Sequence, residues 1–179
     1  DANADAKTKT DALKLIASKD YWRLHWNLHP LQKRVKNWLF VHGKYRELVQ
    51  EIVQTAGTDL QAAQALFAKF DQKLVGHSDF EENMLFKFIK ENLDATVIAP
   101  DALNEITHDH TDTVPKQAEK MKNCQDLTEF QTLIKEYQEH MLVHLEKEEQ
   151  ILIHVWLNLT EEQYKKYREY LSWKYAAVY

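Results

Sequence analysis

The stretch HMLVHLEKEE, which begins at His140, constrains the fold most, because it carries two histidines and three glutamates in ten residues. On a helix that advances about 100° per residue, His140, His144 and Glu148 drift only about 40° per four-residue step, so all three face one side. The same face continues apolar in both directions, through Tyr137 and Ile151. The ionisable groups therefore point toward a core. Buried imidazole and carboxylate groups need partners there, and a metal ion can serve both.

Turn-forming residues are scarce in this chain, which has three glycines and three prolines among 179 residues. Such a sequence is hard to fold as many short strands, and its abundance of Ala, Leu, Lys, Glu and Gln favours long helices. The length suits one domain with a sizeable core, and the 44% hydrophobic content is ordinary for a soluble protein. Composition thus predicts an all-α protein.

Charge and cysteine content narrow the function classes. The formal net charge of −5 and the lack of clustered Lys and Arg argue against nucleic acid as a partner. The single cysteine, Cys124, excludes an internal disulfide, and no run of about 18 apolar residues predicts a membrane span. We see no signal-peptide pattern and expect a cytoplasmic location. The chain begins at Asp1 without a methionine, so a removed targeting segment stays an alternative.

Apolar periodicity and helix start signals predict four long helices and a shorter last one. Pro30 and Pro100 can each open a helix, and the sequences TDLQ, TEFQ and TEEQ read as capping boxes. We expect helices from Pro30 to Gln54, from Thr58 to at least Phe88, from Pro100 onward, from Asp126 or Thr128 to Asn158, and from Glu161 to about Ala176. The predicted fold is an up-down-up-down antiparallel four-helix bundle over residues 30–158, with a lead-in and packing arm over 1–29 and a C-terminal helix over 159–179 packed on the bundle.

Two residues interrupt these helical patterns. Gly76 weakens the second helix by about 1 kcal/mol relative to alanine, which suggests close approach of a neighbour or room at a site. Pro115 removes one backbone hydrogen bond from the third helix, so we expect a kink or break just after the site on that helix.

Each long helix carries one histidine on its inward stripe, and two of these histidines are followed four residues later by a glutamate. The histidines are separated by 35, 33 and 34 positions, as antiparallel helices with short loops require if the imidazoles meet at one level. A single HxxxE pair is a common surface accident, and a bundle with buried polar pairs is the plain alternative. Mixed nitrogen and oxygen ligation suits two iron or manganese ions better than calcium or structural zinc. The candidate ligands are His42, His77, Glu81, His110, His144 and Glu148.

The remaining histidines and acids have weaker claims. His108 lies about 200° from His110 around the helix and should face solvent. His25 and His29 stand four apart in a short aromatic segment, where satisfied or half-exposed histidines are the better interpretation. His140 could supply a fifth imidazole, although an outer hydrogen bond is the better role for it. Glu149 lies about 140° from His144, so it reaches inward only if a bulge widens the turn.

The two motifs HSDFEENMLF, with His77 and Glu81, and HLEKEEQIL, with His144 and Glu148, resemble those of the hemerythrin-like family, the HHE cation-binding domain. The resemblance covers roughly residues 30–158. It implies a four-helix bundle holding a non-haem di-iron centre, with the glutamates bridging the irons and the histidines in outer positions. The cofactor would be two iron ions with an oxo, hydroxo or water bridge, and manganese or zinc could substitute.

The chain departs from oxygen-carrying hemerythrins, which have a His-x-x-x-His pair on the third helix and a histidine followed five residues later by aspartate on the fourth. Four residues after His110 stands Val114, which points to a four-histidine, two-glutamate branch. The resemblance implies reversible binding or sensing of oxygen or iron, with a small diatomic partner such as oxygen or nitric oxide. Reduction of nitric oxide or peroxide, repair of damaged iron centres, iron storage and an empty-site bundle are the alternatives. Repair proteins of this kind usually carry a further cysteine segment, and Cys124 stands alone in a polar loop, so binding is favoured and no catalytic residue is assigned.

Overall fold

The computed structural model describes residues 19–176, and every regular element among them is helical. The all-α prediction is confirmed for this part of the chain, whereas residues 1–18 of the predicted lead-in and packing arm over 1–29 lie outside it. The elements are α2 (Lys19–His25), the 3-10 turns η1 (Trp26–Leu28) and η2 (Gln32–Arg34), α3 (Lys36–Thr55), α4 (Leu60–Phe80), the π-helical η3 (Glu81–Phe86), α5 (Lys87–Asn92), α6 (Asn104–His108), the π-helical η4 (Asp109–Thr113), α7 (Val114–Asn123), α8 (Leu127–Asn158) and α9 (Glu161–Ala176).

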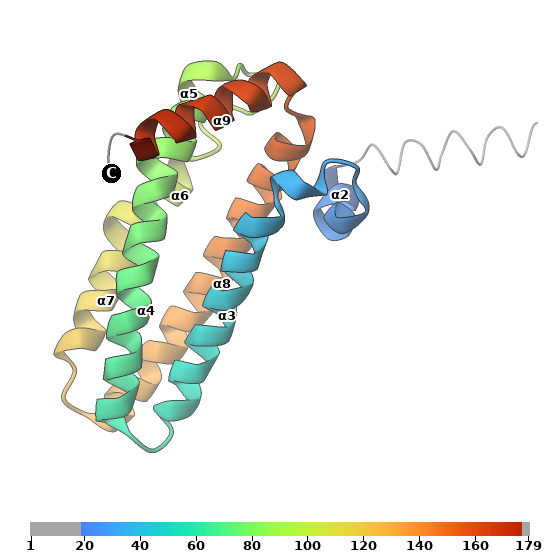
Figure 1. Ribbon diagram of the computed structural model, residues 1–179. Helices are drawn as coiled ribbons and strands as arrows, with labels where there is room; N and C mark the ends of the chain where they lie inside the picture. Colours follow the sequence, from blue (N-terminus) through green and yellow to red (C-terminus); the bar gives the residue numbers. More distant parts are fainter. Residues whose placement is uncertain (1–18, 177–179) are drawn as a thin grey trace, which may run out of the picture.

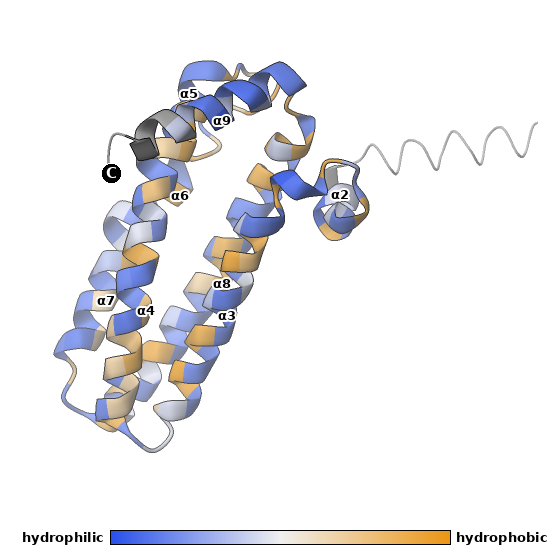
Figure 2. Ribbon diagram, viewed as in Figure 1, coloured by the Kyte–Doolittle hydropathy of each residue, from blue (hydrophilic) through white to orange (hydrophobic). Residues whose placement is uncertain are grey.

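Four helical rods lie side by side along one long axis (Figure 1). Helix α3 is the first rod, α4 continues through η3 into α5, α6 continues through η4 into α7, and α8 is the fourth. The loops that join α3 to α4 and α7 to α8 lie at one end of the bundle, and α9 crosses the other end. Helix α2 packs beside α8. Hydrophilic and hydrophobic residues alternate along each rod in Figure 2, as amphipathic helices with one buried face require.

The apolar core is divided into two clusters. One cluster, toward the loop end, includes Val49, Phe67 and Tyr137. The other, toward α9, includes Leu85 and Trp156. The inward histidines and glutamates belong to the residues that separate the two clusters along the bundle. Apolar side chains therefore lie above and below this polar layer along the bundle axis.

Three predicted helix starts are wrong. Pro30 does not open the first helix, because α3 begins at Lys36 after the 3-10 turn η2. The Nδ1 of His29 accepts a hydrogen bond from the Leu31 N–H, which turns the chain first. The second helix is capped by Asp59 rather than Thr58, because the Asp59 carboxylate accepts from the Ala62 N–H at 2.9 Å. The third helix begins at Asn104, four residues after Pro100, since residues 93–103 form a loop.

The predicted starts of the last two long helical segments agree with the structure. Asp126 caps α8, with its carboxylate accepting from the Glu129 N–H at 2.8 Å. The capping box before α9 is confirmed in both directions, from the Thr160 N–H to Gln163 Oε1 and from the Gln163 N–H to Thr160 Oγ1. Helix α9 covers one end of the bundle through Tyr167, which is buried against Phe88 and Trp156.

The helix irregularities lie at the inward ligands rather than beyond them. The predicted break after the site on the third helix is instead the π-helical turn η4, which contains His110 and ends just before Pro115. A proline cannot donate to the carbonyl one turn back and crowds it, and a widened turn relieves both problems. A second π-helical segment, η3, begins at Glu81. Gly76 has no heavy atom within 4 Å of where a Cβ would stand, so the predicted close neighbour is absent there.

Candidate metal centre

Six side chains from all four rods converge at the middle of the bundle. Their ligand atoms form two groups within which all atoms lie inside 4.8 Å of one another, and the groups share one glutamate. The first group is His42, His77, Glu81 and Glu148, and the second is His110, His144 and Glu148. The structure thus brings together every candidate ligand from the sequence. Their role as ligands stays a prediction.

Both glutamates lie between two pairs of imidazoles. Glu148 Oε1 is 3.1 Å from His144 Nε2 and 3.2 Å from His110 Nε2, while its Oε2 is 3.4 Å from His42 Nε2. Glu81 Oε1 is 3.3 Å from His77 Nε2, and its Oε2 is 3.5 Å from His110 Nε2. Each carboxylate therefore offers one oxygen to each half of the site, which is the arrangement of a bridging ligand.

Three of the four histidines are oriented by an outer carboxylate on Nδ1. Glu149 Oε1 lies 3.0 Å from Nδ1 of His42, and Glu82 Oε1 lies 2.8 Å from Nδ1 of His110. Asp109 Oδ2 lies 3.1 Å from Nδ1 of His144. With a proton on Nδ1, each of these rings would donate to its outer carboxylate and point an Nε2 lone pair into the site. This is how metal-binding histidines are commonly held.

The inner atoms lack the partners that a metal-free core would need. The Nε2 atoms of His110 and His144 lie 3.1 Å apart, and in the tautomer in which each Nδ1–H donates to its outer carboxylate, neither Nε2 has a proton to share with the other. Both glutamates are 0% exposed, and neither oxygen of Glu148 nor Oε2 of Glu81 has a hydrogen-bond partner. Buried unpaired acceptors are costly, and a cation between them removes the cost. The donor set thus fits metal ions.

A comparison with known families agrees with this geometry. The family model "Hemerythrin HHE cation binding domain" matches residues 34–156. The chain belongs to the hemerythrin family. This confirms the resemblance drawn from the two histidine and glutamate motifs, and the four-histidine, two-glutamate composition of the cluster is consistent with it. Searches of curated proteins and of solved structures give no match.

The electrostatics of this hemerythrin site favour cation binding. Burial, and then the neighbouring His42, lowers the pKa of His77 to about 4, so its ring is neutral near pH 7. Burial, and then the charge of Glu148, raises the pKa of Glu81. Burial works in the same direction on Glu148, but its close contacts with His110 and His144 outweigh burial and lower its pKa. In the metal-free site the Glu81 carboxyl therefore tends to hold a proton beside the Glu148 carboxylate, and a bound cation would take the place of that proton.

The other predicted histidines lie outside the cluster. His108 is largely exposed, as its position on the helix predicted. His25 packs on Tyr21, and His29 accepts the Leu31 N–H and packs on Trp22, so both are satisfied histidines. Nε2 of His140 is 3.4 Å from Asp109 Oδ1, so Asp109 stands between His140 and His144.

Sequence reasoning missed the three outer carboxylates as a set. Each of them is a direct sequence neighbour of a candidate ligand: Glu82 follows Glu81, Glu149 follows Glu148, and Asp109 precedes His110. Each reaches a histidine on a different rod. Glu149 does so from a regular α-helix and contacts the outer Nδ1 of His42, so no bulge is needed for it. The available signal was an acidic residue directly beside three of the candidate ligands, Glu81, His110 and Glu148.

Proposed function

We propose that this protein is a non-haem di-iron hemerythrin that binds or senses oxygen, or iron, at a carboxylate-bridged metal pair. The observation that supports this proposal most is that Glu81 and Glu148 each present one oxygen to each half of the site. Mixed imidazole and carboxylate donors suit iron, with manganese or zinc as substitutes. In this proposal residues 30–158 form an up-down-up-down bundle that holds the pair, residues 1–29 form a lead-in and arm, and residues 159–179 close one end.

The proposed ligand set divides evenly. One ion would be held by His42 and His77 and the other by His110 and His144. Glu148 belongs to both groups of ligand atoms, and Glu81, a member of the first group, would reach the second ion through the oxygen that lies 3.5 Å from His110. Six side chains, two of them bridging, offer about eight bonds, whereas two octahedral ions take about twelve. Reduced iron at this site would supply electrons and open positions for a diatomic ligand. The chain itself supplies orientation, through the outer carboxylates, and exclusion of water, through the two apolar clusters.

Binding is favoured over turnover by the position of the nearest tyrosine. The Tyr45 ring lies 5.2 Å from the His77 ring, but its hydroxyl donates to the Lys73 carbonyl at 3.2 Å. Burial, and then the charges of the two glutamates, raises the pKa of Tyr45 to about 12. This hydroxyl is therefore a poor proton donor to a bound ligand, and reductive chemistry needs protons.

Reduction of nitric oxide or peroxide is the second candidate function. It is favoured by the series His140, Asp109 and His144, which leads from a partly exposed imidazole to a candidate ligand. Repair of iron centres is disfavoured, because Cys124 is buried and its thiol donates to the Asp126 carbonyl. Iron storage remains a weaker alternative to both.

Metal content tests the first part of the proposal. Protein expressed in iron-replete medium should carry close to two iron atoms per chain by elemental analysis, because six ligands stand in two halves. Content near zero, or one zinc per chain with no iron uptake, would refute the di-iron proposal.

Oxygen binding tests the second part. The protein is reduced without air, oxygen is admitted, and near-ultraviolet and visible charge-transfer bands are followed before and after oxygen is removed. Bands that appear and reverse support binding or sensing. Irreversible oxidation, or many moles of nitric oxide or peroxide consumed per mole of protein, would instead support the reductase candidate.

A further inference from the structure

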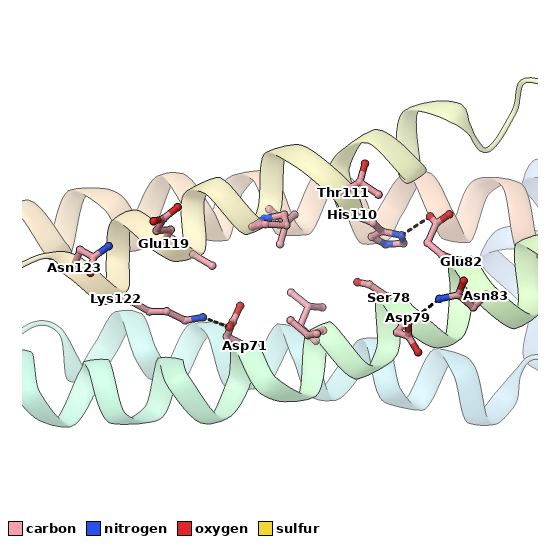
Figure 3. Close-up of a pocket in the computed structure, with 15 residues that line it drawn as sticks. Asp71, Ser78, Asp79, Glu82, Asn83, His110, Thr111, Glu119, Lys122 and Asn123 are labelled. Carbon is pink, nitrogen blue, oxygen red and sulfur yellow. Dashed lines mark hydrogen bonds and ion pairs between the residues drawn. The ribbon is translucent and has the colours of Figure 1, made fainter. Parts of the chain in front are cut away.

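A long groove of about 810 Å³ separates α4 from α7 on one side of the bundle (Figure 3). One end of the groove is marked by the ion pair between Lys122 and Asp71, and the other by the contact between His110 and Glu82. His110 is only 3% exposed, yet it lines the groove. The groove therefore leads from the surface to a candidate metal ligand.

The walls of this groove are mainly apolar and its inner side chains are small. Leu74, Val114 and Ala118 are buried along it, and Val75 lies 59% exposed at its edge. Ser78 lies near His110, at the inner end (Figure 3). Such a lining has few polar groups to bind a large polar molecule, and it does not obstruct the passage of a small apolar one.

The charged groups of the groove are predominantly carboxylates. Asp79, Glu82 and Glu119 line it, whereas Lys122, its one cationic lining residue, is paired with Asp71 at 2.5 Å. Negative charge in a confined groove repels anions and leaves neutral molecules unaffected. The lining thus selects by charge as well as by size.

A second pocket, of about 490 Å³, reaches the opposite side of the site at His77. Aromatic side chains of α9 line it, among them Tyr164 and Tyr167. Arg34 holds the start of α9 in place. Its guanidinium donates to the Leu159 carbonyl at 2.6 Å and pairs with Glu161 at 2.5 Å. The second pocket is therefore lined by a helix that Arg34 holds in place, whereas no residue of α9 lines the groove between α4 and α7.

We propose that the groove between α4 and α7 is the route by which small neutral diatomic molecules reach the metal pair, entering beside His110. This inference rests on the proposed function and adds its ligand class and its point of entry. A route changes the rates of binding and release by the same factor and leaves the equilibrium constant unchanged, which sets it apart from a ligand-binding contact.

The test narrows the groove from the side opposite α7. Ser78→Phe should slow both association and dissociation of oxygen in stopped-flow measurements by about tenfold or more, with the dissociation constant and the spectrum of the adduct unchanged. The matched control is Val41→Phe, which places the same side chain in the second pocket. It should leave both rates within about twofold of the original protein.

The charge selection has its own measurement. In the oxidised protein, Asp79→Asn should speed azide association while oxygen association to the reduced protein stays unchanged, because only the anion responds to the removed charge. Equal acceleration of both ligands would refute the selection.

The outcomes separate the route from the function. No adduct in the original protein refutes the proposed function itself. If an adduct forms but its association and dissociation rates are unchanged by Ser78→Phe, or change equally with Val41→Phe, the groove is not the route. The proposal of a metal pair is unaffected by that result. A changed dissociation constant with unchanged association rate also refutes it.

Discussion

Replacing Glu148 by glutamine should remove metal binding far more completely than the same change at Glu149. Glu148 is fully buried and offers one oxygen to each half of the site, so Glu148→Gln weakens the binding of both ions at once. Glu149 is an outer residue that contacts Nδ1 of His42 at 3.0 Å and Arg46 at 2.8 Å. Losing such an outer partner typically costs about 10–100-fold in metal affinity. Glu148→Gln should exceed that range and leave less than half of the iron bound.

The assay is iron content after dialysis, followed by competition with a chelator of known affinity. Glu146→Gln is the matched control, because Glu146 lies on the same helix, has a 57% exposed side chain and, among the described residues, pairs with Arg23 and accepts from Gln150. It should bind iron as the original protein does. Circular dichroism checks that all three variants keep their helix content. Equal losses at Glu148 and Glu149 would contradict the bridging geometry, and a loss at Glu146 would show that the assay reports charge rather than ligation.

Three further outcomes follow from local geometry. Gly76→Ala should raise the free energy of unfolding by up to about 1 kcal/mol, because nothing lies where the new Cβ would stand. Gly57→Ala should lower the free energy of unfolding, because the new Cβ would meet the Gln54 carbonyl at 3.0 Å. Thermal unfolding of the two variants tests both expectations. Burial raises the pKa of the Cys124 thiol, so alkylation at pH 8 should be at least about tenfold slower in the native protein than in urea, and equal rates would contradict the burial. In the metal-free protein, burial and then Glu148 raise the pKa of Glu81, so the folded state holds more protons and stability should fall as pH rises above the unfolded pKa. The measurement is thermal unfolding from about pH 4.5 to about pH 8, a range that begins near the usual carboxyl pKa of about 4.3. Glu81→Gln should make the loss of stability over this range smaller.

Much of the fold was predictable because helical periodicity is a local property. The inward positions of His42 and His144 follow from the spacing of apolar residues on their own helices, and the capping box at Thr160 involves only residues within one turn. The starts at Pro30 and Thr58 were wrong for a physical reason. At Pro30 a tertiary contact decides, because Arg34 is held by the carbonyls at the end of α8 and the preceding residues form a turn. At Thr58 the reason is local, because the side chain of the next residue, Asp59, caps the helix instead.

The outer part of the candidate site was not predictable from single helices. A regular helix with one inward stripe would place Glu81 and Glu82 on different sides, and likewise Asp109 and His110. The π-helical turns η3 and η4 lie at these two pairs, and in both cases the neighbour of the candidate ligand contacts a histidine on another rod. No residue pattern within one helix specifies that partner, because the pairing exists only once the rods are packed.

His77 differs from the other three candidate histidine ligands in its outer contacts. Among the described residues, no carboxylate lies within ion-pair distance of its Nδ1, whereas His42, His110 and His144 each have one. An outer carboxylate fixes the ring and makes the inner nitrogen a stronger donor, so the half of the site with His77 has one weaker donor than the half with His110 and His144. The two halves match in ligand type along the sequence, yet the packed structure makes them unequal. The weaker half lies at the pocket lined by α9, and the stronger half lies at the groove between α4 and α7.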